Sequence, residues 1–280
     1  MVFLPVYDYN RLRHIKRPWM NWSLIAINIF IYFVFQSDLI LKVGAQVQHT
    51  FGFMPNSILP ASMRQMNVPA LIAEVPGIKV FTYMFLHGDA GHLLGNMLFL
   101  YIFGDNVEDA MGRIRYLVFY LGCGIFSGLA HFWSDTSSQA ALVGASGAIS
   151  GVLAAYLILY PRAKLWALLL FRIPLKVPAF VVLLLYIAYN VFAEIATQFR
   201  ILPDYFNERI AWWAHIGGFI AGIPLTYLLR RPGVELFAKD DTVTDVATGA
   251  QAVPINPMDP PSPGDSSTVI VRVDRPREQP

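Results

Sequence analysis

Six long runs of apolar residues dominate the pattern of this 280-residue chain. A helix needs roughly 20 apolar residues to cross about 30 Å of hydrocarbon, and turn-forming or charged positions separate runs of about that length. The pattern predicts membrane-spanning helices at residues 20–37, 91–111, 114–133, 141–160, 178–199 and 211–230. We therefore expect an all-α polytopic membrane protein built on a six-helix bundle.

The segments outside these runs divide the chain into three regions. Residues 1–17 form an N-terminal segment, residues 18–231 the transmembrane domain, and residues 232–280 a Pro-rich tail that we expect to be disordered, apart from a short strand at 266–273. The connection from Ser37 to Asp89 is long, and long loops usually have a structure or function of their own. We interpret it as an external lobe lying partly in the membrane interface.

Basic residues alternate between the two ends of the predicted helices. They precede the first helix, follow the second, separate the fourth from the fifth and follow the sixth: Arg11, Arg13, Lys16, Arg17, Arg113, Arg115, Arg162, Lys164, Arg172, Lys176, Arg230 and Arg231. By the positive-inside rule both termini are cytoplasmic, which suits a multi-pass protein of a prokaryotic plasma (inner) membrane. Asp105, Glu108 and Asp109 fall in the last turns of the second helix, where we expect a solvated cytoplasmic end.

Composition supports this class and excludes others. The chain is 55% hydrophobic and 14% charged, more apolar than a soluble domain of its size. Its net charge of +2 is too small to indicate nucleic-acid binding. The single Cys123 excludes a disulfide framework and a Cys-rich metal site, and we expect neither a metal nor a cofactor. No signal-peptide cleavage pattern follows the first basic cluster, so we expect the first helix to be retained.

Four polar side chains interrupt the apolar runs. Ser146 lies between Gly144 and Gly147, His92 and Asn96 lie on the second helix, and His215 lies on the sixth. Polar groups at membrane depth are costly and are therefore site candidates. The three helices run from outside to inside, and a rise of about 1.5 Å per residue puts these side chains within roughly 10 Å of the outer ends.

These residue types suit nucleophilic catalysis. A serine hydroxyl is a weak nucleophile until a base takes its proton, and imidazole is the usual base. His215 is the candidate base for Ser146, while helix-end amides with His92 and Asn96 would stabilise an oxyanion. Two small-residue faces permit the necessary helix approach: Gly147 with Gly151, and Gly218 with Gly222. Asn190 and Glu194 lie on the fifth helix, but the sequence does not connect either to His215, so a Ser-His dyad is favoured.

Together these motifs resemble the rhomboid family of intramembrane serine proteases over residues 18–230. The resemblance rests on a GxSG box, an HxxxN pair and an AHxxGxxxG motif: Gly144, Ala145, Ser146, Gly147, His92, Asn96, Ala214, His215, Gly218 and Gly222. It implies Ser146 as nucleophile, His215 as general base, and His92, Asn96 and the Ser146 amide as the oxyanion hole. It also implies a substrate gate near the fifth helix and a structural role for Gly104 and Glu108.

One departure and two alternatives remain. Many family members carry Trp-Arg where this chain has Ile78 and Lys79, which affects the first loop and leaves the dyad intact. The favoured function is cleavage of transmembrane segments of other proteins within the lipid bilayer. A non-catalytic rhomboid-like binder would be expected to lack the serine or histidine, and a transporter using histidines and Glu194 as relays leaves the GxSG box without a role. The sequence does not define the oligomeric state.

Overall fold

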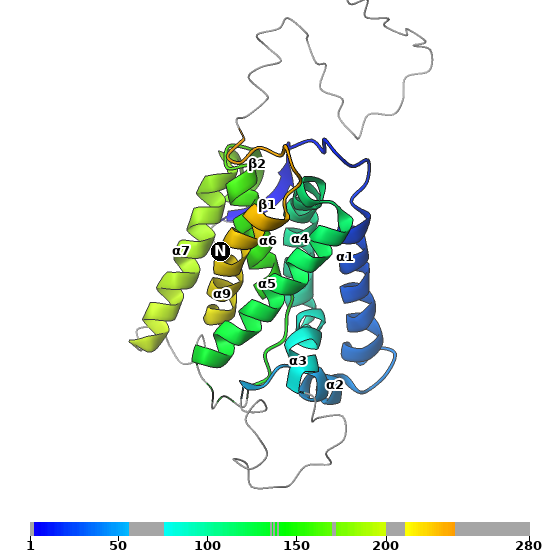
Figure 1. Ribbon diagram of the computed structural model, residues 1–280. Coiled ribbons are helices and arrows are strands. Elements are labelled where there is room, and N and C mark those ends of the chain that lie inside the picture. Colours follow the sequence, from blue (N-terminus) through cyan, green and yellow to red (C-terminus); the bar gives the residue numbers. More distant parts are fainter. Residues whose placement is uncertain are drawn as a thin grey trace, which may run out of the picture. The chain divides into compact units, whose positions relative to one another are not determined.

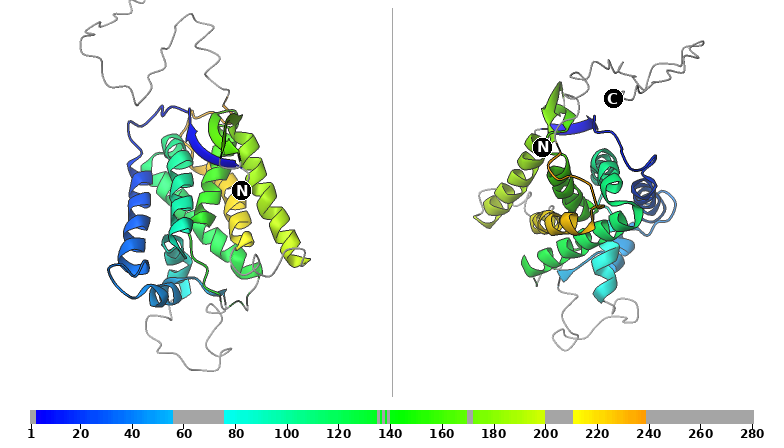
Figure 2. Two further views of the ribbon diagram at one scale, coloured as in Figure 1. Left: turned by 180° about the vertical axis from the view of Figure 1, so that it is seen from behind. Right: turned by 45° about the horizontal axis from the view of Figure 1, so that its top comes forward.

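The computed structural model describes residues 3–55, 76–134, 136, 138, 140–169, 172–199 and 211–238 (Figures 1 and 2). The chain divides into two units, Met1–Asp240 and Asp241–Pro280, and the described elements all belong to the first. The strand predicted at 266–273 lies outside the described residues, as does the stretch 56–75 of the long connection.

Helices occupy all six predicted regions, and the protein is mostly helical. They are α1 (Trp19–Ile31), which continues into the π-helical η1 (Tyr32–Gln36), α4 (Ala90–Met111), α5 (Arg113–Ser134), α6 (Ser146–Leu159), α7 (Ala179–Gln198) and α9 (Trp212–Leu229). The predicted positions are confirmed to within one residue, except that α6 begins at Ser146 rather than at residue 141. The segments Trp19–Gln36, Arg113–Ser134 and Ala179–Ala196 are long and apolar enough to cross a membrane.

The long connection contains short helices: α2 (Gly44–Phe51), α3 (Pro76–Thr82) and the 3₁₀ turn η4 (Tyr83–Phe85). Phe53 and Leu142 exchange two backbone hydrogen bonds of 3.0 and 2.8 Å, which join this connection to the loop before α6. On α3, Ile78 is exposed and Lys79 is buried.

Helix α6 lies at the centre of the bundle (Figure 1) and packs against α4, α5 and α9. It is buried continuously from Gly147 to Tyr156, as expected of a helix that is apolar on all sides. Helices α1 and α7 lie on opposite sides of it, as the view from behind in Figure 2 also shows. The residue that begins α6, Ser146, therefore lies among several helices.

Glycines allow the backbones of α6 and α9 to touch. A Cβ atom added to Gly218 would collide with the carbonyl oxygen of Gly147, and one added to Gly222 would lie 2.6 Å from the carbonyl oxygen of Gly151. On another side of α6, a Cβ at Gly151 would collide with the side chain of Cys123 on α5. Small residues on α6 and α9 thus set the spacing of these helices.

A three-stranded antiparallel sheet corrects the expectation of a purely helical fold. β1 (Phe3–Asp8) pairs with β2 (Lys164–Leu169), and β2 pairs with β3 (Ile173–Pro178). Leu165 and Ala167 on β2 are fully buried, so the strand has a core-facing side. The strands have only six residues each, and β1 finds its partner far along the chain, so a local pattern does not reveal the pairing.

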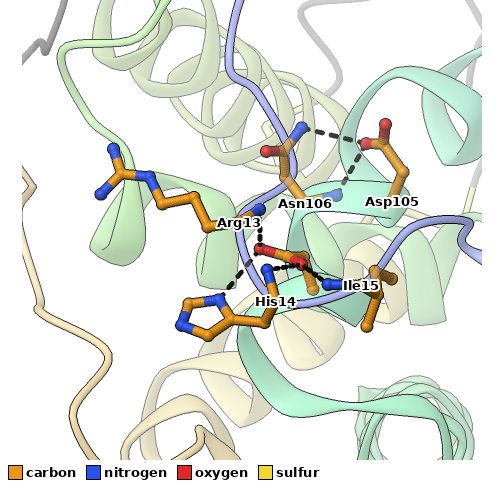
Figure 3. Close-up of polar contacts among 6 residues, drawn as sticks. Arg13, His14, Ile15, Asp105 and Asn106 are labelled. Atoms are coloured by element: carbon orange, nitrogen blue, oxygen red, sulfur yellow. Dashed lines mark hydrogen bonds and ion pairs between the residues drawn. The ribbon is translucent and has the colours of Figure 1, made fainter. Parts of the chain in front are cut away.

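The acidic end of α4 is buried rather than solvated, which corrects a second expectation. Asp109 is 1% exposed and accepts backbone hydrogen bonds from Arg13, His14 and Ile15 at 2.9, 2.7 and 2.7 Å (Figure 3). A segment that precedes the first helix therefore satisfies this carboxylate. The His14 ring adds a contact, with Nδ1 3.1 Å from Asp109 Oδ2. The other three donors are main-chain N–H groups, which leave no pattern of side chains, so the sequence does not predict the contact.

Glu108 also accepts main-chain hydrogen bonds, in this case from the start of α1. Its carboxylate accepts hydrogen bonds from the backbone N–H groups of Met20 and Asn21 at 3.2 and 2.7 Å. These donors lie in the first turn of α1, where helical N–H groups have no intrahelical partner and favour negative charge. Gly104 leaves room for the Asn21 side chain, which a Cβ would strike. Gly104 and Glu108 thus hold α1 against α4.

Asp8 connects the sheet to two helices. Its Oδ2 atom accepts hydrogen bonds from Asn106 Nδ2 on α4 at 3.0 Å and from the Tyr156 hydroxyl on α6 at 2.6 Å. Burial, together with the nearby charge of Asp105, raises the pKa of Asp8 from 3.8 to about 8. In the folded protein this carboxyl is therefore mostly protonated at neutral pH.

Replacing Gly218 by Ala should destabilise the protein by about 1–3 kcal/mol, because the methyl group meets backbone that cannot move without separating α6 from α9. The matched control is Gly95→Ala on α4, where an added Cβ has no neighbour within 4 Å and should be neutral or slightly stabilising. Thermal unfolding in detergent micelles measures both. Equal unfolding midpoints for the two variants would contradict the close-packing argument.

The stability of the wild type should contain a component that decreases as pH rises from about 4 to about 8. In that window the folded chain keeps a proton on Asp8 that the unfolded chain releases, so a higher pH favours unfolding. The variant Asp8→Asn carries no titrating group at this position and should lack the component. Unfolding midpoints of the two proteins across this pH range test it, and parallel curves would refute the assignment.

Candidate active site

The loop that precedes α6 presents Ser146 at the start of that helix. Gly144 has a φ of +130°, a conformation that L side chains rarely adopt, and a Cβ there would lie 2.8 Å from two ring atoms of His92. Its N–H donates to the carbonyl oxygen of Tyr83 at 3.0 Å. Glycine is therefore required at this position both for the turn and for the approach of the His92 ring to the chain beside Ser146.

Ser146 and His215 are hydrogen-bonded. The distance from Ser146 Oγ to His215 Nε2 is 2.8 Å, within the range for a direct bond. His215 lies in the first turn of α9, and its ring packs near the rings of Trp212 and Tyr186, with centroids 6.3 and 6.4 Å away. The structure thus brings together two residues that are 69 positions apart in the sequence.

His92 and Asn96 lie one turn apart near the start of α4. A Cβ atom added to Gly144 would lie 2.8 Å from His92 Nε2 and 3.5 Å from Ser146 Oγ. The His92 ring is therefore close to the serine hydroxyl. Asn96 Nδ2 is buried and has no hydrogen-bond partner within the described part of the chain. A buried donor without an acceptor is unusual and is available to an oxygen of a bound molecule.

His87 lies next to His92, a contact that the sequence leaves open. Their ring centroids are 5.3 Å apart in an edge-on arrangement. The main chain of His87 is fixed by the side-chain amide of Gln36, which donates to its carbonyl oxygen at 3.0 Å and accepts from its N–H at 3.1 Å. Burial, and secondarily His92, lowers the pKa of His87 to about 3, so its ring is neutral.

Helix α7 supplies contacts that the sequence analysis left undecided or missed. Asn190 Oδ1 lies 2.6 Å from His215 Nδ1. The Tyr186 hydroxyl is bonded to Ser150 Oγ at 2.8 Å, and Ser150 donates to the carbonyl oxygen of Ser146 at 2.8 Å. Tyr186 and Asn190 are four residues apart, as are Ser146 and Ser150. Residues at this spacing lie on the same face of a helix, and this is the sequence signal that links the members of each pair.

Among the described residues, no three His, Cys, Asp or Glu side chains are grouped so as to hold a metal ion. The polar groups around Ser146 are two imidazoles, two amides and hydroxyls. This set of groups suits proton transfer and hydrogen bonding to an oxygen atom.

Fold and site define a helical membrane protein in which a serine and a histidine meet at the N-terminal ends of two closely packed helices. Residues 77–232, more than half of the chain, match the family model of the Rhomboid domain. The chain belongs to the rhomboid family.

Named relatives agree with this membership. The chain is 31% identical to RHOMBOID-like protein 2 of Arabidopsis thaliana over 240 residues, covering 76% of this chain and 68% of that one. It is 32% identical to the mitochondrial Rhomboid protein 1 of Saccharomyces cerevisiae over 52% of this chain and 40% of the yeast protein. With the putative rhomboid protease YdcA of Bacillus subtilis it shares 28% identity over 54% of this chain and 66% of that one. For several other relatives the matched region spans roughly half of their length.

Proposed function

We propose that this chain is an intramembrane serine endopeptidase that hydrolyses peptide bonds in or near the transmembrane segments of other membrane proteins. The 2.8 Å hydrogen bond between Ser146 Oγ and His215 Nε2 carries the proposal. Membership of the rhomboid family supports it, as do relatives in Bacillus subtilis that are named as rhomboid proteases.

In this proposal His215 Nε2 takes the hydroxyl proton as Ser146 Oγ attacks the carbonyl carbon of the substrate. The resulting tetrahedral intermediate collapses when His215 returns the proton to the leaving amine. Water then attacks the acyl-serine, again with His215 as base, and releases the second product.

Three donors are proposed to stabilise the oxyanion. Asn96 Nδ2 is buried and unpartnered among the described residues, the His92 ring lies beside Gly144, and the Ser146 amide belongs to the first turn of α6, where helical N–H groups have no intrahelical acceptor. Donors of this kind act most strongly where water is excluded.

The depth of the site suggests where the substrate is cut. α6 has 14 residues and a length of about 21 Å, less than the roughly 30 Å of hydrocarbon, so its N-terminal end would lie below one membrane surface. His92 and His215 also lie in the first turns of their helices. With six spans and cytoplasmic termini, this end is the external one. We infer cleavage near the outer end of a substrate helix, which must unwind to expose its carbonyl groups.

Replacing Ser146 by Ala should abolish both cleavage of a reporter transmembrane substrate and covalent labelling by a fluorophosphonate, because the attacking oxygen is gone. The fold should be unaffected, since Ala also fits among the small residues. Ser23→Ala, on the exposed face of α1, is the matched control and should label like the wild type. Cleavage at the same bond by purified Ser146→Ala protein would refute the proposed function.

Replacing Asn96 by Leu should lower the cleavage rate by about 10²-fold while leaving stability equal or higher. One oxyanion donor is lost, but an unpartnered buried amide is replaced by an apolar side chain of similar size, which removes a desolvation cost. Cleavage kinetics and thermal unfolding test the two parts separately. Wild-type turnover in this variant would remove Asn96 from the oxyanion hole.

A further inference from the structure

Asn190, a polar side chain of α7, is hydrogen-bonded to the histidine of the site. It is 1% exposed, and its Oδ1 atom lies 2.6 Å from His215 Nδ1. The other end of its amide, Nδ2, donates to the main-chain carbonyl oxygen of Tyr186, one turn earlier on α7, at 2.8 Å. Both ends of the side chain are therefore engaged.

These two bonds determine which way the amide faces. A main-chain carbonyl oxygen only accepts hydrogen bonds, so the group that faces Tyr186 must be the NH₂ donor. The oxygen of Asn190 then faces His215, and because oxygen only accepts, Nδ1 of the imidazole must carry a proton. A neutral imidazole protonated on Nδ1 has its lone pair on Nε2, the atom that faces Ser146.

We propose that Asn190 is a positioning residue for His215: its carbonyl oxygen holds the imidazole in the tautomer and orientation that allow Nε2 to accept the proton of Ser146. The inference rests on the proposed function and adds a third member to the Ser-His pair. Asn190 acts through His215 and touches neither the nucleophile nor the scissile bond.

Neighbouring contacts keep this arrangement rigid. The rings of Tyr186 and Trp212 pack near the imidazole, and the ring of Tyr189 packs edge-on against Trp212 with centroids 5.6 Å apart. Tyr186 and Asn190 lie one turn apart on the side of α7 that faces His215, whereas Tyr189 is 44% exposed and Phe192 is 60% exposed. One face of α7 is thus directed at the histidine.

The test compares Asn190→Leu with Asn190→Asp. Leu is close in size but offers no acceptor, so kcat for a reporter substrate should fall by about 10- to 10²-fold with KM nearly unchanged, and fluorophosphonate labelling should slow equally. Asp keeps an acceptor and should recover most of the loss. Its carboxylate favours the protonated imidazole, so the acid limb of its pH–rate profile should move to higher pH.

Phe30→Leu on the exposed side of α1, away from the expected substrate gate, is the control and should retain wild-type kcat and pH profile. Thermal unfolding of each variant separates lost chemistry from lost structure. If Asn190→Leu does not fold, the pH profile of Asn190→Asp decides.

Three results are distinguishable. Wild-type kcat in folded Asn190→Leu overturns the inference while leaving the proposed function intact. So do equal losses in both variants with an unshifted acid limb, since they indicate packing alone. Labelling or cleavage that persists in Ser146→Ala overturns the proposed function itself.

Discussion

Direct contact between the backbones of α6 and α9 is the constraint on which the site depends. Gly218 faces the carbonyl of Gly147, and Gly222 faces that of Gly151, so no larger residue fits between the two helices. A hydrogen bond weakens quickly beyond its optimum, and an extra 1 Å between the helices would break the 2.8 Å contact of Ser146 with His215. Glycines, which have no side chain, thus position the two side chains that are proposed to perform the chemistry.

A second constraint acts at the other end of α4. That helix carries His92 and Asn96 in its first two turns, and Glu108 and Asp109 in its last. The two carboxylates accept main-chain hydrogen bonds from the start of α1 and from the segment before it. Bonds to charged acceptors are strong where water is scarce. They attach α1 to α4 although α1 exposes much of its apolar surface, and they fix the helix that supplies the proposed oxyanion donors.

The features that the sequence reveals are local ones. Apolar runs locate the helices because each helix satisfies its own backbone, so length and composition suffice. Length and composition do not predict the sheet, because β1 and β2 each contain only six residues and lie far apart in the sequence. The burial of Asp109 is not predicted either, because three of its hydrogen bonds come from main-chain N–H groups and the fourth contact, with the His14 ring, is far away in the sequence. Within the site, the polar interruptions of apolar helices identify Ser146 and His215 as candidates, but the contact of Asn190 with His215 is a property of packing.

The membrane environment explains why the proposed third residue is an amide rather than an acid. A triad in water-exposed proteins commonly uses a carboxylate to hold the histidine, and a search of this sequence for such an acid leads towards Glu194. Within a membrane protein an ionised carboxylate is expensive, whereas an amide oxygen supplies the same acceptor without charge. Asn190, whose Oδ1 lies 2.6 Å from His215 Nδ1, adds no charge to the site. In the proposed mechanism the imidazolium and the oxyanion form together when the proton leaves Ser146, so their charges offset each other. A neutral acceptor thus meets the geometric requirement of a triad at a depth where a buried acid would be costly to keep ionised.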